Sequence, residues 1–568
     1  MHYSQYFLRS IILLLSFAYL KISNPMLNEN LMVMRRHHPK NSIHTGLYII
    51  YTIVLVILCL AATSCNQQGS MQRVTLAPGS APAYEIPADM DIEYEPSLNT
   101  EEYDRIIENT FKDTWQNPFS TFSIDVDNAS YSNVRRYLRN HMIPPRDAVR
   151  IEELINYFDY QYPAPAGERP FAVITEMAEC PWNTGNMLVH IGIQGQKPDY
   201  ENLPPSNLTF LIDVSGSMDS PAKLPLVKKS IKLLLDQLGE KDRVSIVVYA
   251  GAAGLVLPST PVMQKGKIKN ALSQLTAGGS TAGGEGIRLA YQVNQQGFIA
   301  GGNNRVILAT DGDFNVGVSS SSELVRMIEK ERQKGTYLTI CGFGMGNYKD
   351  GRMEQISNAG NGNYFYIDGI REAEKVFAKE MRANLFTIAR DVKVQVEFNP
   401  AKVKAYRLLG YENRVMASED FNNDRKDAGE LGAGHSVTAL YEVVPAAGDL
   451  EVPKHDPARY QRVVAREPAN ANEWMSLKLR YKPLDDDNSI LITDVLTKEP
   501  SDFIQSSDNL RFASAAAGFG MLLRASRFSG DLTYADVIEM AQHSSSAADG
   551  DRQEFMELVR SAALLDAD

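Results

Sequence analysis

Between residues 205 and 386, short and almost wholly apolar segments alternate with longer amphipathic ones. The apolar segments have the length of buried strands, and we expect strands at 208–213, 243–249, 305–310, 337–343 and 364–367. The amphipathic segments carry apolar residues at helical spacing, and we expect helices at 223–238, 265–275, 285–295, 322–334, 349–358 and 372–384. Strands that are apolar on both faces require helices on both sides of a parallel sheet. The pattern therefore predicts a central, doubly wound α/β domain over 205–386.

The regions on either side of this domain have a different pattern. In 101–204 we expect helices at 131–140 and 147–158, with Asn128 or Ser130 capping the first, and strands at 171–177 and 187–194. In 387–568 we expect strands at 392–398, 405–409, 436–443, 475–481 and 489–495, followed by helices from about residue 505 onward. These patterns predict an N-terminal α+β module and a C-terminal domain that is first β-rich and then helical.

The first 65 residues have the pattern of an export signal. The apolar run 46–63 follows the basic residues Arg35, Arg36 and Lys40. It ends on small residues before Cys65, which resembles a bacterial lipobox, although Ala62 stands where leucine is usual. By that resemblance Cys65 would carry lipid and become the first residue of the mature chain. The alternative is an uncleaved transmembrane anchor, for which the run is just long enough. Both interpretations place the rest of the chain outside the cytoplasm, anchored in the cell envelope.

A second, shorter apolar run lies at 10–20, upstream of the basic stretch. Two export signals in tandem would be redundant, so we expect translation to begin near Met34. Residues 66–100 are rich in Gln, Ser, Pro, Ala and acidic groups and show no sustained period. They are expected to form a flexible tether between the lipid and the folded part.

Composition and charge narrow the classes of function. A chain of 568 residues with 44% hydrophobic and 22% charged residues is typical of a folded protein with several domains. The net charge of −12 argues against a nucleic-acid partner, which would require a basic face. Cys180 and Cys341 are the two cysteines downstream of Cys65; a disulfide between them stays open, and we expect buried free thiols.

Candidate chemistry gathers where predicted strands of the α/β domain end. Asp213, Ser215 and Ser217 form a D-x-S-x-S pattern after the first strand, Asp311 follows the third, and Thr281 precedes the helix 285–295. In a parallel sheet these loops emerge at one edge, where ligands bind. Two carboxylates and three hydroxyls are hard oxygen ligands that suit Mg²⁺ or Mn²⁺, and Ca²⁺ less well. Helix capping and a simple turn would explain single motifs, but all three in order indicate a metal site.

These residues resemble the metal-ion-dependent adhesion site of the von Willebrand factor type A domain family. The resemblance implies that Ser215, Ser217 and Thr281 bind the metal directly, and that Asp213 and Asp311 do so directly or through water. It also implies an open position for an Asp or Glu carboxylate of a partner protein. Segments at 123–127, 181–183 and 410–414 resemble a bacterial lipoprotein family that carries such a domain between an N-terminal module and a C-terminal domain of unknown function.

Other candidate sites have weaker support in the sequence. Asp125 and Asp127 are interpreted either as a second metal site or, preferably, as caps of the next helix. Asp424, Asp427 and Glu430 are interpreted either as Ca²⁺ ligands or, preferably, as a solvated turn. The glycine-rich segment 342–346 lacks the spacing and the lysine of a phosphate loop, so it is expected to be a turn. The five histidines of the folded part show neither metal spacing nor a nucleophile motif, and we expect no enzymatic activity.

The sequence thus predicts a lipid-anchored, extracytoplasmic protein that binds a protein ligand through a divalent metal. The alternative is a scaffold of an envelope assembly in which the metal only stabilises the domain. The periplasmic face is favoured over the cell surface because no acidic run follows Cys65.

Overall fold

The computed structural model describes residues 101–167, 169–197, 203–279, 283–312, 321–346, 348–380, 384–448, 450–451, 472–545 and 548–567. The export signal, Cys65, the tether and Thr281 lie outside these residues. Within the described ranges, no helix combines the length and the apolar character that crossing a membrane requires.

The middle of the chain folds into a six-stranded sheet with the order β10-β9-β8-β5-β6-β7. Its strands are β5 (Ser206–Asp213), β6 (Arg243–Tyr249), β7 (Ala253–Pro261), β8 (Asn303–Thr310), β9 (Thr336–Phe343) and β10 (Tyr364–Ile367). All neighbours pair in parallel except β6 and β7, which are antiparallel. The predicted α/β fold is therefore confirmed, with one antiparallel edge strand, β7, in a stretch where no strand was predicted.

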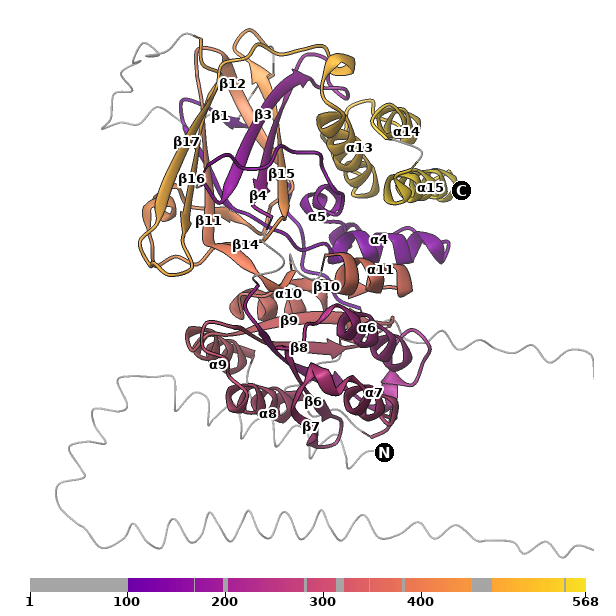
Figure 1. Ribbon diagram of the computed structural model, residues 1–568. Coiled ribbons are helices and arrows are strands. Elements are labelled where there is room, and N and C mark those ends of the chain that lie inside the picture. The colour runs from indigo at the N-terminus through magenta and orange to yellow at the C-terminus, as the bar shows by residue number, and fades with distance from the viewer. Residues whose placement is uncertain are drawn as a thin grey trace, which may run out of the picture. The chain divides into compact units, whose positions relative to one another are not determined.

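Helices cover both faces of this sheet (Figure 1). They are α6 (Leu224–Gln237), α7 (Lys265–Ser273), α8 (Gly283–Gln296), α9 (Ser321–Gln333), α10 (Asp350–Ala359) and α11 (Ile370–Glu374), the last continuing as a π-turn at Lys375–Lys379. Leu208, Phe210 and Ile212 of β5 pack with α6 and α7, whereas Leu211 packs with α8 and α9. Because side chains of a strand alternate between faces, one strand contributes to both apolar cores.

Strands from before and after the α/β domain form two further antiparallel sheets. One has the order β1-β12-β15-β4-β3, the other β13-β2-β11-β16-β17, with β14 added to β11. The strands of the first are β1 (Lys112–Asp113), β12 (Val403–Leu409), β15 (Ser436–Pro445), β4 (Met187–Gly195) and β3 (Phe171–Glu179). Those of the second are β13 (Val415–Met416), β2 (Phe119–Ser123), β11 (Thr387–Phe398), β16 (Met475–Lys482), β17 (Ile490–Leu496) and β14 (Gly429–Gly432). Residues of both sheets share one apolar core, so the α/β domain is an insertion between β4 and β11 of a β-sandwich.

Helices from both ends of the chain pack on one sheet of this sandwich (Figure 1). They are α4 (Ala129–Arg139), α5 (Ile151–Asn156), α13 (Asp508–Leu523), α14 (Tyr534–Gln542) and α15 (Gly550–Leu565). Their core includes Leu188, Leu409 and Leu440 from three strands of the sheet. Helix α13 packs closely against α5. A side-chain carbon added at Gly520 would lie only 2.9 Å from Ile151. The small residues of α13 therefore allow close packing.

Several local expectations need correction. The helix expected at 147–158 is divided into a 3₁₀ turn at Arg146–Ala148 and α5. Asn128 stands at the N-terminus of α4 but makes no capping bond with its side chain. Instead, the Glu153 carboxylate accepts the Ser130 N–H at 2.8 Å, so a distant helix caps this one. Cys180 and Cys341 are separate, buried free thiols, as expected.

Candidate functional site

The carboxyl ends of β5 and β8 bring two aspartates to the same edge of the central sheet. The two strands pair in parallel, with Ile212 opposite Ala309. Asp213 is the last residue of β5, Asp311 directly follows β8, and both side chains are fully buried. The sequence placed these two carboxylates at one sheet edge because parallel strands end there together, and the structure agrees.

The D-x-S-x-S segment folds into a tight loop that turns both serines the same way. The Ser215 N–H donates to Asp213 Oδ1 at 2.9 Å, and a 3₁₀ turn follows at Gly216–Met218. The hydroxyl oxygens of Ser215 and Ser217 lie 3.0 Å apart. Ser215 is buried, whereas Ser217 is exposed. The loop thus presents a pair of hydroxyls at an opening to solvent, beside a buried carboxylate.

The segment that precedes Thr281 is bound to this loop through the backbone. The Gly216 N–H donates to the Gly279 carbonyl at 3.0 Å, and the Gly278 N–H donates to the Val214 carbonyl at 2.7 Å. Gly279 has φ +91°, a conformation that favours glycine. Thr281 itself lies outside the described residues, but the chain leading to it is held at the site.

Lys223, which no sequence motif indicated, is a further charged group of the site. Its Nζ donates to Asp311 Oδ2 at 2.8 Å, and the lysine stands at the N-terminus of α6. Thr310 Oγ1 lies 3.4 Å from Asp213 Oδ2, so the two strand ends are also joined by a hydroxyl. The sequence feature that could have indicated Lys223 is a lysine at the start of the helix that follows the D-x-S-x-S loop. Such a lysine is ordinarily a solvated surface residue, so the feature is weak.

The electrostatics of the site suit a hard cation. Burial raises the pKa of Asp213, the hydrogen bonds from Ser215 lower it, and the nearby Asp311 carboxylate raises it again. Two buried carboxylates close together disfavour each other's ionised form, and a cation removes that penalty. Carboxylate and hydroxyl oxygens with one side open match the ligands that Mg²⁺ and Mn²⁺ take in proteins. The residues present therefore fit the divalent metal that the sequence suggested.

Asp125 and Asp127 belong to a different cluster. One oxygen each of Asp125, Asp127 and Glu354 lies within 4.8 Å of the others. Arg414 forms ion pairs with all three, at 3.0, 3.2 and 3.2 Å. The Asp127 carboxylate also accepts the Tyr364 N–H at 2.8 Å. The guanidinium supplies the positive charge here, so these aspartates join β10 and α10 to the loop after β12 rather than capping α4.

Asp424 and Asp427 lie before β14 and Glu430 lies within it, and each has a partner of its own. Asp427 pairs with Arg332 at 2.8 Å, Glu430 accepts a hydrogen bond from Asn361 at 2.6 Å, and Asp424 Oδ2 faces the Ser489 N–H at 3.5 Å. Asp424 and Asp427 therefore agree with the interpretation as a turn, whereas Glu430 belongs to a strand and corrects it. The glycine-rich segment after β9 is also a turn, as expected.

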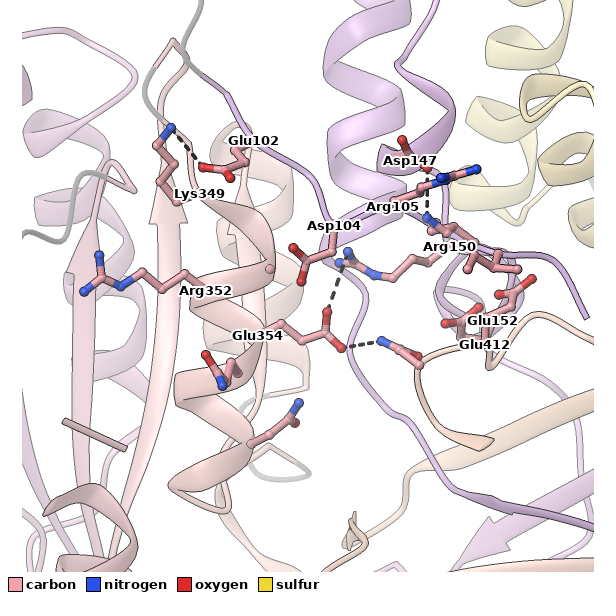
Figure 2. A pocket seen from close by; sticks show the side chains of 16 residues that line it. Glu102, Asp104, Arg105, Asp147, Arg150, Glu152, Lys349, Arg352, Glu354 and Glu412 are labelled. Carbon is pink, nitrogen blue, oxygen red and sulfur yellow. Dashed lines mark hydrogen bonds and ion pairs between the residues drawn. The ribbon is translucent and has the colours of Figure 1, made fainter. Parts of the chain in front are cut away.

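A cavity of about 780 Å³ lies between α10 and the start of α5 (Figure 2). Its lining includes Glu102, Asp104, Arg105, Asp147, Arg150, Glu152, Lys349, Arg352, Glu354 and Glu412. Glu152 is only 1% exposed, and neither of its carboxylate oxygens has a side-chain hydrogen-bond partner among the described residues, although the backbone of Tyr411 and of Glu152 itself lowers its pKa somewhat. Burial and the charges of Glu412 and Asp125 raise the pKa of Glu152 to about 7.

Replacing Glu152 with glutamine is expected to stabilise the protein at pH 8 but not near pH 4.5. Because the folded-state pKa is raised to about 7, the folded chain holds a proton that the unfolded chain releases above its lower pKa. The wild type therefore loses stability as pH rises from about 4.5 to 7, by up to about 3 kcal/mol, and the amide variant does not. Thermal unfolding across this range measures the difference. The exposed Glu557→Gln control should show the same pH profile as the wild type. A Glu152→Gln variant that changes stability equally at both ends of the range, or a control that behaves like Glu152→Gln, would contradict this.

Comparison with known proteins finds family models over most of the chain and a relative that shares most of its length. The profile of the von Willebrand factor type A domain matches residues 207–379, one described as von Willebrand factor matches 97–190, and that of the C-terminal part of the uncharacterized protein YfbK matches 383–565. The uncharacterized protein YfbK of Escherichia coli (strain K12) is 39% identical over 511 residues, which are 89% of this chain and 88% of that protein. The uncharacterized protein sll0103 of Synechocystis is 28% identical over 34% of this chain and 45% of its own.

The solved structures that match share less of the sequence. A von Willebrand factor type A protein from Catenulispora acidiphila is 16% identical, covers 71% of this chain and 91% of its own, and has a TM-score of 0.40. The hypothetical protein BatB from Bacteroides thetaiotaomicron is 23% identical, covers 31% of this chain and 97% of its own, and has a TM-score of 0.27.

Proposed function

Since the chain belongs to the family of YfbK and itself carries a von Willebrand factor type A domain, we propose that it binds a protein partner through a divalent cation at the ends of β5 and β8. Domains of this type commonly mediate protein interactions and commonly bind a divalent metal. The observation that carries the proposal is the set of oxygen atoms from Asp213, Ser215, Ser217 and Asp311, which meet at one sheet edge that is open at Ser217.

Each of these residues has a distinct part in the proposed site. The Ser215 and Ser217 hydroxyls, with Thr281, are direct ligands, and the buried carboxylates of Asp213 and Asp311 supply negative charge directly or through water. A bound Mg²⁺ or Mn²⁺ supplies a coordination position that a partner's Asp or Glu carboxylate can fill. Because Ser217 is exposed while the aspartates are buried, the partner would approach from the Ser217 side.

Ser217→Ala is expected to weaken Mg²⁺ and Mn²⁺ binding about tenfold, since it removes one neutral ligand but keeps both carboxylates. Calorimetric titration of the full chain measures this. Ser220→Ala, in the same loop, is the matched control and should bind like the wild type. Wild-type binding that is unaffected by Ser217→Ala would place the metal elsewhere.

A scaffold role is the second candidate function, because the loops of the site are bound to one another by backbone hydrogen bonds that a metal could stiffen. The two roles predict different effects of metal removal on partner binding and on the melting temperature. In the binding role, chelation abolishes contact with the partner and lowers the melting temperature only slightly. In the scaffold role, chelation lowers the melting temperature strongly and the partner is bound without metal.

We also propose that the chain is anchored to a membrane through lipid on Cys65, facing the periplasm or the cell surface. The proposal rests on the basic stretch, the apolar run and the small residues before Cys65. The mass of the N-terminal peptide from the mature protein tests it. A peptide that begins at Cys65 with an added diacylglyceryl group supports it, and an unmodified or uncleaved segment contradicts it.

A further inference from the structure

We propose that Lys223 is a resident cation of the candidate metal site, and that its charge sets how strongly the site binds a divalent ion. This rests on the proposed function of the site. Lys223 is 8% exposed and Asp311 is fully buried, and their charged atoms lie 2.8 Å apart. Lys223 directly precedes α6, the helix that follows the D-x-S-x-S loop. Its ammonium therefore reaches the site from the same connection that carries Ser215 and Ser217.

The turn after β9 is shaped to hold this lysine. The aliphatic part of Lys223 crosses Gly344, where a side-chain carbon would come within 2.4 Å of Cε and 2.5 Å of Cγ. Gly344 also has φ +79°, which other residues rarely adopt. The Tyr366 hydroxyl donates to the Gly344 carbonyl and fixes the turn. Glycine at this position thus both reverses the chain and leaves the channel along which the lysine reaches Asp311.

The charges of the site show what this lysine does. Asp213 and Asp311 carry two negative charges and Lys223 one positive charge, which leaves a single net negative charge to attract a metal ion. With a divalent ion the same three groups are net positive, a state that favours the carboxylate of an acidic partner. Without Lys223 the empty site would be doubly negative and the loaded site neutral. Lys223 therefore lowers affinity for the ion and raises attraction for the partner.

The size of the effect follows from the distances. Unit charges a few ångströms apart interact strongly enough in a partly buried site to change an affinity by at least about tenfold. Asp311 has no exposed surface and Lys223 little, so solvent screens their charges less than those of a surface pair. If Lys223 were only a structural counter-ion, with no metal at this edge, its replacement would leave metal affinity unchanged.

Calorimetric titration of the full chain with Mn²⁺ tests the proposal. Lys223→Gln, which removes the charge but keeps a hydrogen-bond donor for Asp311, is expected to bind Mn²⁺ at least about tenfold more tightly than the wild type. Lys223→Arg keeps the charge and is expected to bind like the wild type. Lys229→Gln, on the exposed side of the same helix, removes the same charge away from the site and controls for net charge.

The outcomes separate this inference from the proposed function. If the wild type binds Mn²⁺ and Lys223→Gln binds equally or more weakly, only the role of Lys223 is overturned. If the wild type does not bind and Lys223→Gln does, the inference holds and metal-bridged binding by the natural chain is overturned. If neither binds, both are overturned.

Thermal unfolding gives a second readout that shows whether the variant folds. Lys223→Gln in EDTA is expected to melt below the wild type, because Asp311 loses its counter-charge. Mn²⁺ is expected to raise its melting temperature by more than it raises that of the wild type. A variant that melts low and gains nothing from Mn²⁺ would overturn the inference, since Lys223 would then have only a structural role.

Discussion

Asp213→Ala is expected to lower the affinity for Mg²⁺ and Mn²⁺ more than about 100-fold, the upper end of what loss of an outer-shell partner costs. Asp213 holds a charged oxygen at the centre of the site, fixes the Ser215 backbone at 2.9 Å and faces the Thr310 hydroxyl. Its loss removes half of the negative charge and releases the loop that orients both serines. Titration calorimetry measures the loss, and Mn²⁺ should no longer raise the melting temperature of the variant.

Two further variants decide how the Asp213→Ala result is interpreted. Asp213→Asn keeps the shape and an acceptor for the Ser215 N–H but removes the charge, so it should fold like the wild type and still lose most of the affinity. Asp219→Ala, at an exposed position of the same loop, should change neither property. Wild-type affinity in both Asp213 variants would mean that this carboxylate does not serve a metal.

Arg414→Met is expected to lower the free energy of unfolding by about 3–5 kcal/mol, the range for breaking a buried ion pair from one side. Arg414 forms ion pairs with Asp125, Asp127 and Glu354, and all four side chains are largely buried. Without it, three carboxylates remain together in a poorly solvated place, where burial already raises the pKa of Asp127 and of Glu354. Urea unfolding followed by tryptophan fluorescence measures the loss.

The pH dependence of Arg414→Met identifies the cause. Because the carboxylates repel one another only when ionised, the deficit should shrink as pH falls and they take up protons. Adding Asp127→Asn to Arg414→Met should recover part of the loss. The exposed Arg425→Met removes the same charge from the same region and should cost little. A deficit that is independent of pH and unaffected by Asp127→Asn would contradict the electrostatic explanation.

The central fold could be predicted because its signals are local. Buried strands such as β5 and β8 are apolar along their length, and helices such as α6 repeat apolar residues at helical spacing, so each element is visible in a short window. The edge strand β7 was missed as a strand because its pairing with β6 contains register shifts and its apolar residues are partly exposed. The candidate metal-site residues could be picked out because each lies next to a recognisable strand or helix.

The β-sandwich could not be predicted because its pairs lie far apart in the chain. Val394 of β11 pairs with Phe122 of β2 across the whole inserted domain, and nothing near either residue indicates the other. The same separation hid Arg414 as the partner of Asp125 and Asp127. Lys223 was missed for a different reason. A lysine at a helix start is ordinarily solvated, and only the sheet topology brings Asp311 to it.

Anomalous scattering from crystals of the full chain soaked in Mn²⁺ shows directly where the ion binds. One strong peak is expected at the carboxyl ends of β5 and β8, within bonding distance of the Ser215 and Ser217 hydroxyls and beside Asp213 and Asp311. Absence of a peak there at saturating Mn²⁺, or a peak among Asp125, Asp127 and Glu354 instead, would contradict it.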